Sequence, residues 1–221
     1  MSRVETRLVL ASVAPLSDPA LFARGLSQVS AQRREKIARF RAEGAGRLSL
    51  GAALLLNRVL AEAGLPPAGA FDFGPEGKPW LPDRPGLHFS LSHSGELVLC
   101  ALSDAELGCD VETPRRVNAA LVRRFFHPDE QRWLFSLPQG EQDAAFLRLW
   151  TLKESYVKAI GLGLSLPLDA FCVLPEGEGY ALTQRTDPRP WQLGSFQTED
   201  CVCSFCALEA PPRLERCPLF D

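Results

Sequence analysis

W-T-L-K-E-S-Y-V-K-A-I-G-L-G-L, residues Trp150–Leu164, is the stretch that decides the fold, and the rest of the chain is arranged around it. Apolar residues recur at helical spacing through it and just before it, at Phe146, Leu149, Trp150, Val157 and Ile160. Such spacing is typical of a helix with one buried face. Gly161 follows the last of them, where glycine readily takes the left-handed backbone that ends a helix. We therefore predict a long helix that ends at Gly161.

Charged residues oppose this apolar face, namely Lys153, Glu154 and Lys158. Glu154 and Lys158 are four residues apart, so a helix makes them neighbours on one surface. The simplest interpretation of such a pair is a solvated ion pair worth about 0.2–0.5 kcal/mol. A functional interpretation gains weight only from a second acidic element upstream.

That second element is Gly108–Glu112, which reads G-C-D-V-E after an apolar run at residues 97–102 and is expected to be a strand. Asp110 and Glu112 then lie side by side on one face. Adjacent carboxylates repel unless a cation lies between them, and oxygen ligands suit magnesium. With Glu154 as a third ligand, the site would hold a metal against a phosphorylated substrate. The alternative is an exposed strand end.

Composition sets limits on the class of protein. A chain of 221 residues that is 46% hydrophobic can bury one large core or two modest ones. The net charge of −3 argues against a general nucleic-acid-binding protein. We find no signal-peptide pattern and no uninterrupted apolar run of membrane-spanning length, so we expect a soluble cytoplasmic protein that binds no membrane.

Cysteine usage favours buried free thiols. The chain has 7 cysteines, an odd number. Cys201, Cys203 and Cys206 fall in an alternating, strand-like run with no histidine near them. A zinc site is therefore not expected in that run.

A local basic region precedes the acidic elements. Helices are expected at residues 31–41 and from about residue 48 to residue 63. The basic residues of this region are Arg33, Arg34, Lys36, Arg39, Arg41, Arg47 and Arg58. The same region contains only three glutamates, so its net charge is positive. A basic patch of this size is compatible with the binding of one polyanionic small molecule. An ordinary solvated helical face is the alternative.

A polar strand motif comes next, F-S-L-S-H-S at Phe89–Ser94. Ser92 and His93 together suggest a hydrolase, but the G-x-S-x-G nucleophile motif is missing, and neighbours on a strand point to opposite faces. A serine and a histidine that end a strand can instead donate hydrogen bonds to a phosphate. The alternative for His93 is a structural or surface histidine.

Both halves of the chain have a similar order of strand, helices and further strands. We therefore expect an α+β fold of two similar α/β halves that meet near Asp104–Gly108, namely residues 1–106 and residues 107–221. The last stretch, Pro211–Asp221, is broken by prolines and is expected to lie on the surface.

Five motifs taken together resemble the 4′-phosphopantetheinyl transferases, in particular the single-chain, Sfp-type branch. They are G-K-P at Gly77–Pro79, F-S-L-S-H-S at Phe89–Ser94, G-C-D-V-E at Gly108–Glu112, R-F-F-H-P-D-E at Arg124–Glu130, and the stretch Trp150–Leu164. The similarity runs over almost the whole chain in the family's order and spacing. Each motif alone is weak evidence for the family, whereas five motifs in the same order and spacing are specific evidence.

The resemblance implies a fold and a reaction. The two halves would be related by a pseudo-twofold, with coenzyme A and magnesium in the cleft between them. The reaction would move the phosphopantetheine arm of coenzyme A onto a serine of an apo acyl-carrier or peptidyl-carrier protein and release adenosine 3′,5′-bisphosphate. A monomer is expected.

The resemblance also implies roles for residues at matching positions. The expected magnesium ligands are Asp110, Glu112 and Glu154. The expected contacts to the adenosine 3′-phosphate and nearby phosphates are Arg33, Lys36, Arg47, Ser92 and His93. Lys78 would lie by the adenine and Lys158 at the pyrophosphate. Glu130 matches an acidic position near the metal.

Two positions depart from the family's pattern. Many relatives have an acidic residue on the helix before the arginine, whereas this chain has E-G-A-G-R at Glu43–Arg47. Each glycine weakens a helix by up to about 1 kcal/mol. Leu56 occupies a position that is often arginine. We therefore expect weaker phosphate contacts and an unchanged set of metal ligands.

The chemistry of the reaction agrees with these roles. The attacking serine must lose its proton, and the expected general base is Glu154 or a water held by Glu130 and the metal. Lys158 and magnesium would neutralise charge on the leaving group. Two alternatives remain at this point, a noncatalytic module that binds coenzyme A or a carrier domain and a metal-dependent nuclease. The carrier is expected to dock on Val117–Phe126, unless these residues simply build the core.

Overall fold

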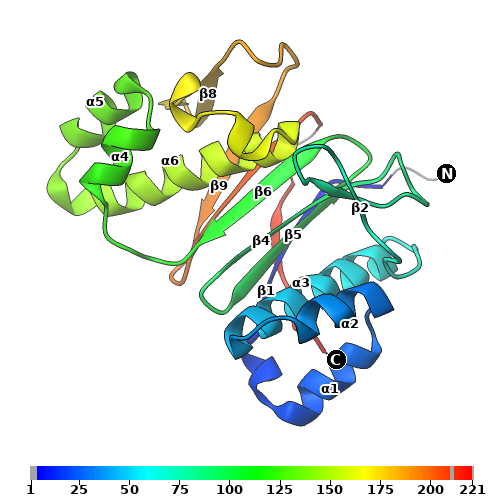
Figure 1. Cartoon of the computed structure of the whole chain (residues 1–221). Coiled ribbons are helices and arrows are strands. Elements are labelled where there is room, and N and C mark those ends of the chain that lie inside the picture. The colour runs from blue at the N-terminus through cyan, green and yellow to red at the C-terminus, as the bar shows by residue number, and fades with distance from the viewer. Residues whose placement is uncertain (1–3, 210–211, 221) are drawn as a thin grey trace.

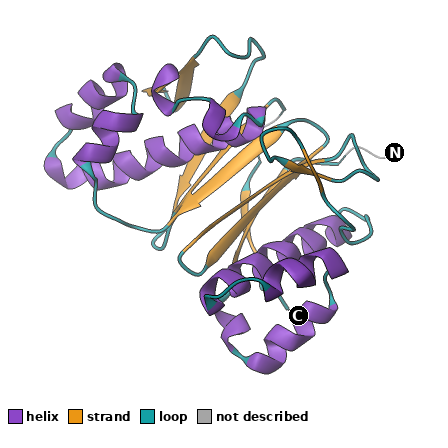
Figure 2. Cartoon of the chain, in the orientation of Figure 1, coloured by secondary structure: helices purple, strands orange, loops and turns teal. Residues whose placement is uncertain are grey.

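The computed structural model describes residues 4–209 and 212–220, and it places two β-sheets between two groups of helices (Figures 1 and 2). The first sheet has the strand order β11 (Leu214–Arg216), β1 (Arg7–Ser12), β5 (Leu97–Ser103) and β4 (His88–Ser94). The second sheet has the order β6 (Leu107–Glu112), β10 (Val202–Ala207) and β9 (Gln192–Gln197). The expected α+β class is confirmed.

The helices of the first half pack together, and the last of them lies on the outer face of the first sheet (Figure 1). They are α1 (Pro19–Ser27), α2 (Ala31–Ala38) and α3 (Glu43–Glu62), preceded by the 3-10 turn η1 (Ala14–Ser17). Leu55 and Val59 of α3 are fully buried against Val9 and Leu102 of the sheet. Short strands β2 (Asp72–Phe73) and β3 (Pro79–Trp80) form a small hairpin beyond α3.

The helices of the second half pack together, and the last of them lies on the outer face of the second sheet (Figure 1). They are α4 (Ala119–Phe125), α5 (Pro128–Ser136) and α6 (Gln139–Ile160), followed by the 3-10 turns η2 (Gly163–Ser165) and η3 (Leu168–Ala170) and by the hairpin of β7 (Cys172–Glu176) and β8 (Gly179–Thr183). As predicted, α6 ends at Gly161, whose φ of 73° lies in the left-handed region. The apolar side of α6 packs on β6 and β10.

Strand residues alternate between two cores, which explains why β1, β5, β6 and β10 are apolar almost throughout. On β1, Val9 faces the helices, whereas Leu8 and Leu10 belong to a third core that both sheets share. Cys109 and Val111 of β6 enter this shared core from the other sheet. Because side chains alternate along a strand, Gly108, Asp110 and Glu112 face the side of β6 on which α6 packs.

Gly108 allows α6 to lie directly on β6. A Cβ atom at this position would be 2.1 Å from the carbonyl oxygen of Ser155 and 2.4 Å from the amide nitrogen of Ala159. Both atoms belong to the helix backbone, which cannot move aside without shifting the whole helix. The short distance between α6 and β6 therefore depends on glycine at residue 108.

The structure differs from the sequence predictions at two places. Helix α3 begins at Glu43 rather than near Leu48, so it includes both glycines of Glu43–Arg47. The C-terminal stretch does more than lie on the surface, because β11 pairs in parallel with β1 and Leu219 is buried in the first core. Pro211 and Asp221 lie outside the described residues.

The division at residue 106 stays a prediction, as does the pseudo-twofold. Residues 214–216 return to the sheet of the first half, so at least one strand crosses the expected boundary. Within the described chain, no helix combines the length and hydropathy needed to cross a membrane.

We predict that Gly108→Ala destabilises the protein by about 1–3 kcal/mol or more, because the added methyl group meets helix backbone. Urea unfolding followed by circular dichroism measures the change. Gly44→Ala in α3 is the matched control, since a Cβ at residue 44 meets nothing within 4 Å, and it should stabilise the protein by up to about 1 kcal/mol. Equal stability of the two variants would show that the contact of α6 with β6 is not tight.

Candidate functional site

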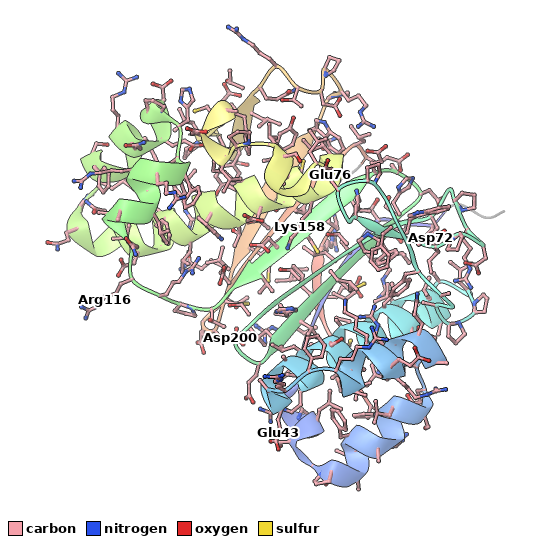
Figure 3. All side chains as sticks on the ribbon, viewed as in Figure 1. Glu43, Asp72, Glu76, Arg116, Lys158 and Asp200 are labelled. Carbon is pink, nitrogen blue, oxygen red and sulfur yellow. The ribbon has the colours of Figure 1, made fainter. Side chains whose placement is uncertain are left out.

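Side chains of α6 and β6 meet where the two sheets adjoin. Lys158 lies between the two halves (Figure 3). Its Nζ atom donates to Asp110 Oδ1 at 2.7 Å and to Ser92 Oγ, on β4, at 3.0 Å. The sequence predicted a Glu154–Lys158 pair, whereas the structure pairs Lys158 with Asp110. This lysine therefore joins elements from both halves.

Asp110 is the most buried acid of this site, with 5% of its surface exposed. Its Oδ1 atom accepts hydrogen bonds from Ser92 and Lys158, at 2.6 and 2.7 Å. Its Oδ2 atom is buried and has no hydrogen-bond partner among the described residues. A buried carboxylate oxygen without a partner is costly, and a bound cation would remove that cost. This observation fits the expected metal ligand.

Glu154 projects from α6 toward the same region. It makes no hydrogen bond or ion pair within residues 4–209 and 212–220. Burial and the negative charge of Asp110 raise its pKa, Lys158 opposes the shift, and Glu112 adds to it. Glu154 is thus coupled electrostatically to both other acids, and its carboxylate is available to a ligand or a proton.

Within the described chain, both carboxylate oxygens of Glu112 accept hydrogen bonds, unlike those of Glu154. Its Oε2 atom accepts from Ser94 Oγ at 2.8 Å, and its Oε1 atom accepts from Arg115 at 3.2 Å. We call Asp110, Glu112 and Glu154 the carboxylate site. Their ligand atoms do not all lie within 4.8 Å of one another in the described structure. The structure thus brings the three acids to one region without drawing them into a closed ligand set.

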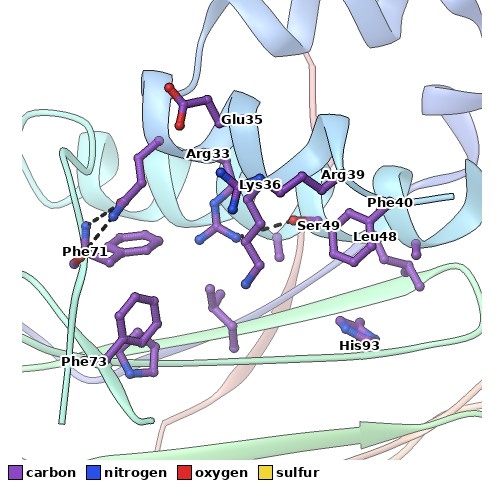
Figure 4. A pocket seen from close by; sticks show the side chains of 15 residues that line it. Arg33, Glu35, Lys36, Arg39, Phe40, Leu48, Ser49, Phe71, Phe73 and His93 are labelled. Atoms are coloured by element: carbon purple, nitrogen blue, oxygen red, sulfur yellow. Dashed lines mark hydrogen bonds between the residues drawn. The ribbon is translucent and has the colours of Figure 1, made fainter. Parts of the chain in front are cut away.

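A basic pocket of about 710 Å³ opens beside β4 (Figure 4). It is lined by α2, α3 and the segment at Phe71–Phe73, and His93 lies at its floor on β4. The guanidinium of Arg33 lies 4.9 Å from the ring centre of Phe71 and 3.4 Å from Ser49 Oγ. This combination of cations and aromatic rings suits a planar anionic molecule.

The predicted phosphate ligands Arg33, Lys36 and His93 do line this one pocket. Burial lowers the pKa of Arg33. Burial, and then the charge of Arg33, lowers the pKa of Lys36. Glu35 also lines the pocket, but neither cation forms an ion pair with a carboxylate within residues 4–209 and 212–220, so both can take up an anion.

A second pocket of about 220 Å³ adjoins the first, and the two share Pro79 and Leu91 as lining residues. Lys78, Ser90 and Lys158 line the second pocket. The two pockets together lead from the cations of α2 to the lysine that contacts Asp110. An elongated molecule with anionic groups at both places could span them.

Three predicted ligands lie elsewhere than expected. Ser92 points away from His93 and supports Asp110, because neighbours on β4 face opposite sides. Arg47 does not line the basic pocket; its guanidinium lies 3.8 Å from Glu96, and its Nε atom is buried without a partner among the described residues. Lys78 donates to two backbone carbonyl oxygens, of Ala159 at 2.7 Å and Leu107 at 3.3 Å.

Glu130, the predicted catalytic acid on α5, has no exposed surface. Its Oε1 atom accepts from Lys153 Nζ at 2.6 Å and from the amide of Val173 at 2.7 Å, and its Oε2 atom accepts from the amide of His127 at 2.8 Å. Both oxygens are therefore used inside the second core. The catalytic role expected for Glu130, and the water it would hold, stay predictions, and in this structure neither oxygen is open to a ligand.

Lys153 was expected among the exposed charges of α6, and it too is fully buried. Its ammonium lies between Glu130 and the carbonyl oxygen of Phe171, 4.1 Å from the ring centre of Phe171. Burial raises the pKa of Glu130 and lowers that of Lys153, while each charge opposes the shift of the other. Sequence spacing alone could not reveal this pair, because its partners come from α5 and α6.

The sequence analysis did not predict that serine hydroxyls join the two sheets. Ser90, Ser92 and Ser94 alternate along β4, and all three hydroxyls bond to β6 or the residue after it. Ser90 accepts from the amide of Cys109, and Ser94 accepts from the amide of Thr113. The period of two in S-L-S-H-S was the available signal, since it predicts three hydroxyls on one strand face.

Comparisons with known proteins bear on this site. A family model described as the 4′-phosphopantetheinyl transferase superfamily matches residues 106–206. A 4′-phosphopantetheinyl transferase of Bacillus subtilis is 37% identical over 166 residues, 74% of this chain and 74% of that protein. The 4′-phosphopantetheinyl transferase Sfp of Bacillus subtilis (strain 168) is 36% identical over 179 residues, 80% of each chain. A crystal structure of a holo-(acyl-carrier-protein) synthase from Bacillus anthracis in complex with CoA (3′,5′-ADP) is 18% identical, with a TM-score of 0.43, over 48% of this chain and 97% of that one.

We predict that Glu154→Gln stabilises the folded protein near neutral pH. Burial and the charge of Asp110 raise the pKa of Glu154 above its usual value of 4.5. The unfolded chain therefore ionises first, and stability falls as the pH rises from 4.5 through the raised pKa. Urea unfolding at pH 7 should show a higher midpoint for the variant, and the difference should shrink near about pH 4. Glu141→Gln, at an exposed position of the same helix, is the matched control.

Proposed function

Because the chain belongs to the 4′-phosphopantetheinyl transferase superfamily, we propose that it moves the phosphopantetheine arm of coenzyme A onto a serine of an apo acyl-carrier or peptidyl-carrier protein. One observation carries the proposal beyond family membership. The basic pocket adjoins a second pocket that ends at Lys158, which contacts Asp110. A molecule with phosphates at two separate places, as in coenzyme A, matches this arrangement.

The adenosine end of coenzyme A would bind in the basic pocket. Arg33, Lys36 and His93 line that pocket and would receive the 3′-phosphate, while Phe71 offers an aromatic face. The pyrophosphate would then lie near Lys158. Burial lowers the pKa of Lys158, but the charge and hydrogen bond of Asp110 together with the charges of Cys109 and Glu154 outweigh it, so the pKa is raised and the ammonium stays protonated.

The carboxylate site has the donor set of a magnesium site. Asp110 and Glu154 each have an oxygen without a protein partner among the described residues, and Glu112 lies beside them on β6. Oxygen donors of this kind suit a small hard cation. Magnesium held there would neutralise charge on the pyrophosphate oxygens.

The remaining steps fall to side chains of α6. The carrier serine attacks the β-phosphorus; its oxygen forms the new P–O bond, and the bridging P–O bond to the adenosine side breaks. Glu154 is the proposed acceptor of the serine proton, because its raised pKa brings a carboxylate closer to the range of a useful base. Lys158 stabilises the negative charge on the departing adenosine 3′,5′-bisphosphate.

The carrier would approach the open side of this site. Of the segment expected to contact it, Val122 and Phe126 are fully buried and build the second core, whereas Leu121 and Phe125 are partly exposed. We therefore assign the docking contact to Leu121 and Phe125. A monomer acting in the cytoplasm completes the proposal.

We predict that Glu154→Gln lowers the rate of transfer by about 10²–10⁴-fold, because the serine proton loses its acceptor. Coenzyme A binding should survive, since the basic pocket is unchanged. Intact-mass measurement of an apo carrier protein incubated with coenzyme A and magnesium follows transfer, and calorimetry follows binding. Glu141→Gln on the same helix is the control. Near-normal turnover by Glu154→Gln would remove Glu154 from the reaction.

Asp110→Ala should abolish magnesium-dependent transfer, because it removes the buried oxygen that has no protein partner. Titration of magnesium against the transfer rate should give a saturating curve for the unchanged protein and no response for the variant. Incubation of the unchanged protein with magnesium and DNA is expected to give no cleavage. Cleavage there, together with an unmodified carrier, would favour the nuclease alternative.

A further inference from the structure

A second group of metal-ligating side chains lies in the second half, outside the carboxylate site. His127, Asp129 and Cys172 each offer one ligand atom, and these atoms all lie within 4.8 Å of one another. No other such group of three occurs among residues 4–209 and 212–220. His127 caps α5, Asp129 belongs to its first turn, and Cys172 begins β7. The reaction proposed above uses none of them.

Hydrogen bonding leaves electron pairs, rather than protons, facing the centre of this cluster. The backbone amide of Asp129 donates to Nδ1 of His127 at 3.2 Å, so Nδ1 carries no proton. The Oδ2 atom of Asp129 lies 3.6 Å from that same nitrogen. Two acceptors facing each other at this distance repel, and a cation between them would turn the repulsion into attraction.

Cys172 supplies the third donor. Cys172 is buried, and its sulfur accepts a hydrogen bond from the backbone amide of Glu130. The side chains of His127 and Asp129 are 32% and 42% exposed, so an ion can reach the cluster from solvent. One nitrogen, one oxygen and one sulfur donor suit zinc and do not suit magnesium.

We propose that His127, Asp129 and Cys172 bind a zinc ion that ties the start of α5 to the start of β7. Three protein ligands leave a fourth position for water. The thiol proton is released to the solvent when the S–Zn bond forms, so charge and atoms balance. Because Glu130 accepts the amide of His127 and pairs with Lys153, the ion would strengthen the packing that holds α6.

Binding has identifiable costs, which predict a moderate affinity. Burial, and then the charge of Glu130, raises the pKa of Cys172 to about 11, so its proton must be displaced. Coordination through Nδ1 gives up the bond from the Asp129 amide. Arg132 pairs with Asp129 Oδ1 and can stay there, because the oxygen that faces His127 is Oδ2.

The test uses cobalt(II), which replaces zinc and shows a thiolate-to-cobalt absorption band when sulfur is a ligand. The full chain, freed of metals with a chelator and then saturated with magnesium, is titrated with cobalt(II). We expect one equivalent to produce the band and zinc to abolish it by competition. Cys172→Ser should lose the band. His127→Asn should weaken binding at least about 10–100-fold while its side chain still caps α5.

The matched control is the double variant Cys201→Ser/Cys203→Ser, since these two thiols lie 3.6 Å apart and offer a second pair of sulfur donors. The band should survive in it. Zinc should also raise the urea midpoint of the unchanged protein and leave that of Cys172→Ser unaltered. Absence of the band in the unchanged protein, its persistence in Cys172→Ser, or its loss in the control would each overturn the proposal. None of these readouts depends on transferase activity.

Discussion

The direct contact of α6 with the backbone of β6 is the constraint on which the rest of the structure depends. It exists because residue 108 has no side chain, so that Ser155 and Ala159 reach the strand. This contact fixes which face of α6 lies against β6, and thereby sets Lys158 opposite Asp110. A bulkier residue at 108 would lift the helix and separate Lys158 from Asp110. The packing of α6 and the position of this ion pair thus depend on one glycine.

The two halves are joined by polar groups as well as by the shared core. The hydroxyls of β4 bond to β6, Lys158 reaches Ser92, and Lys78 bonds to the carbonyl oxygens of Leu107 and Ala159. These bonds lie beside the two pockets, so a ligand that enters them contacts both halves. The buried oxygen of Asp110 has no partner among the described residues, and the pKa of Glu154 is raised. Both features lower the free energy of unfolding near neutral pH. Such a loss of stability is typical of functional sites.

The ion pair of Glu130 and Lys153 shows that residues of a family motif can also build the core. Both residues belong to motifs that carry the family resemblance; Lys153 was expected among the charges opposite the apolar face of its helix, and Glu130 near the metal. The structure buries them completely, and backbone amides of His127 and Val173 complete the contacts of Glu130. A residue can be specific to a family because it holds the core together, so that its presence in a motif does not place it at the reacting atoms.

The sequence alone was sufficient to predict those features that depend on neighbouring residues along the chain. The spacing of apolar residues and Gly161 determined the course and end of α6, and the period of two determined that Asp110 and Glu112 share a face of β6. The five motifs determined the family. Only the tertiary structure decided that Lys158 pairs with Asp110, that Ser92 and His93 serve different sites, and that 214–216 return to β1. These outcomes depend on contacts between residues distant in sequence, and neither helical nor strand periodicity carries information about which element lies opposite.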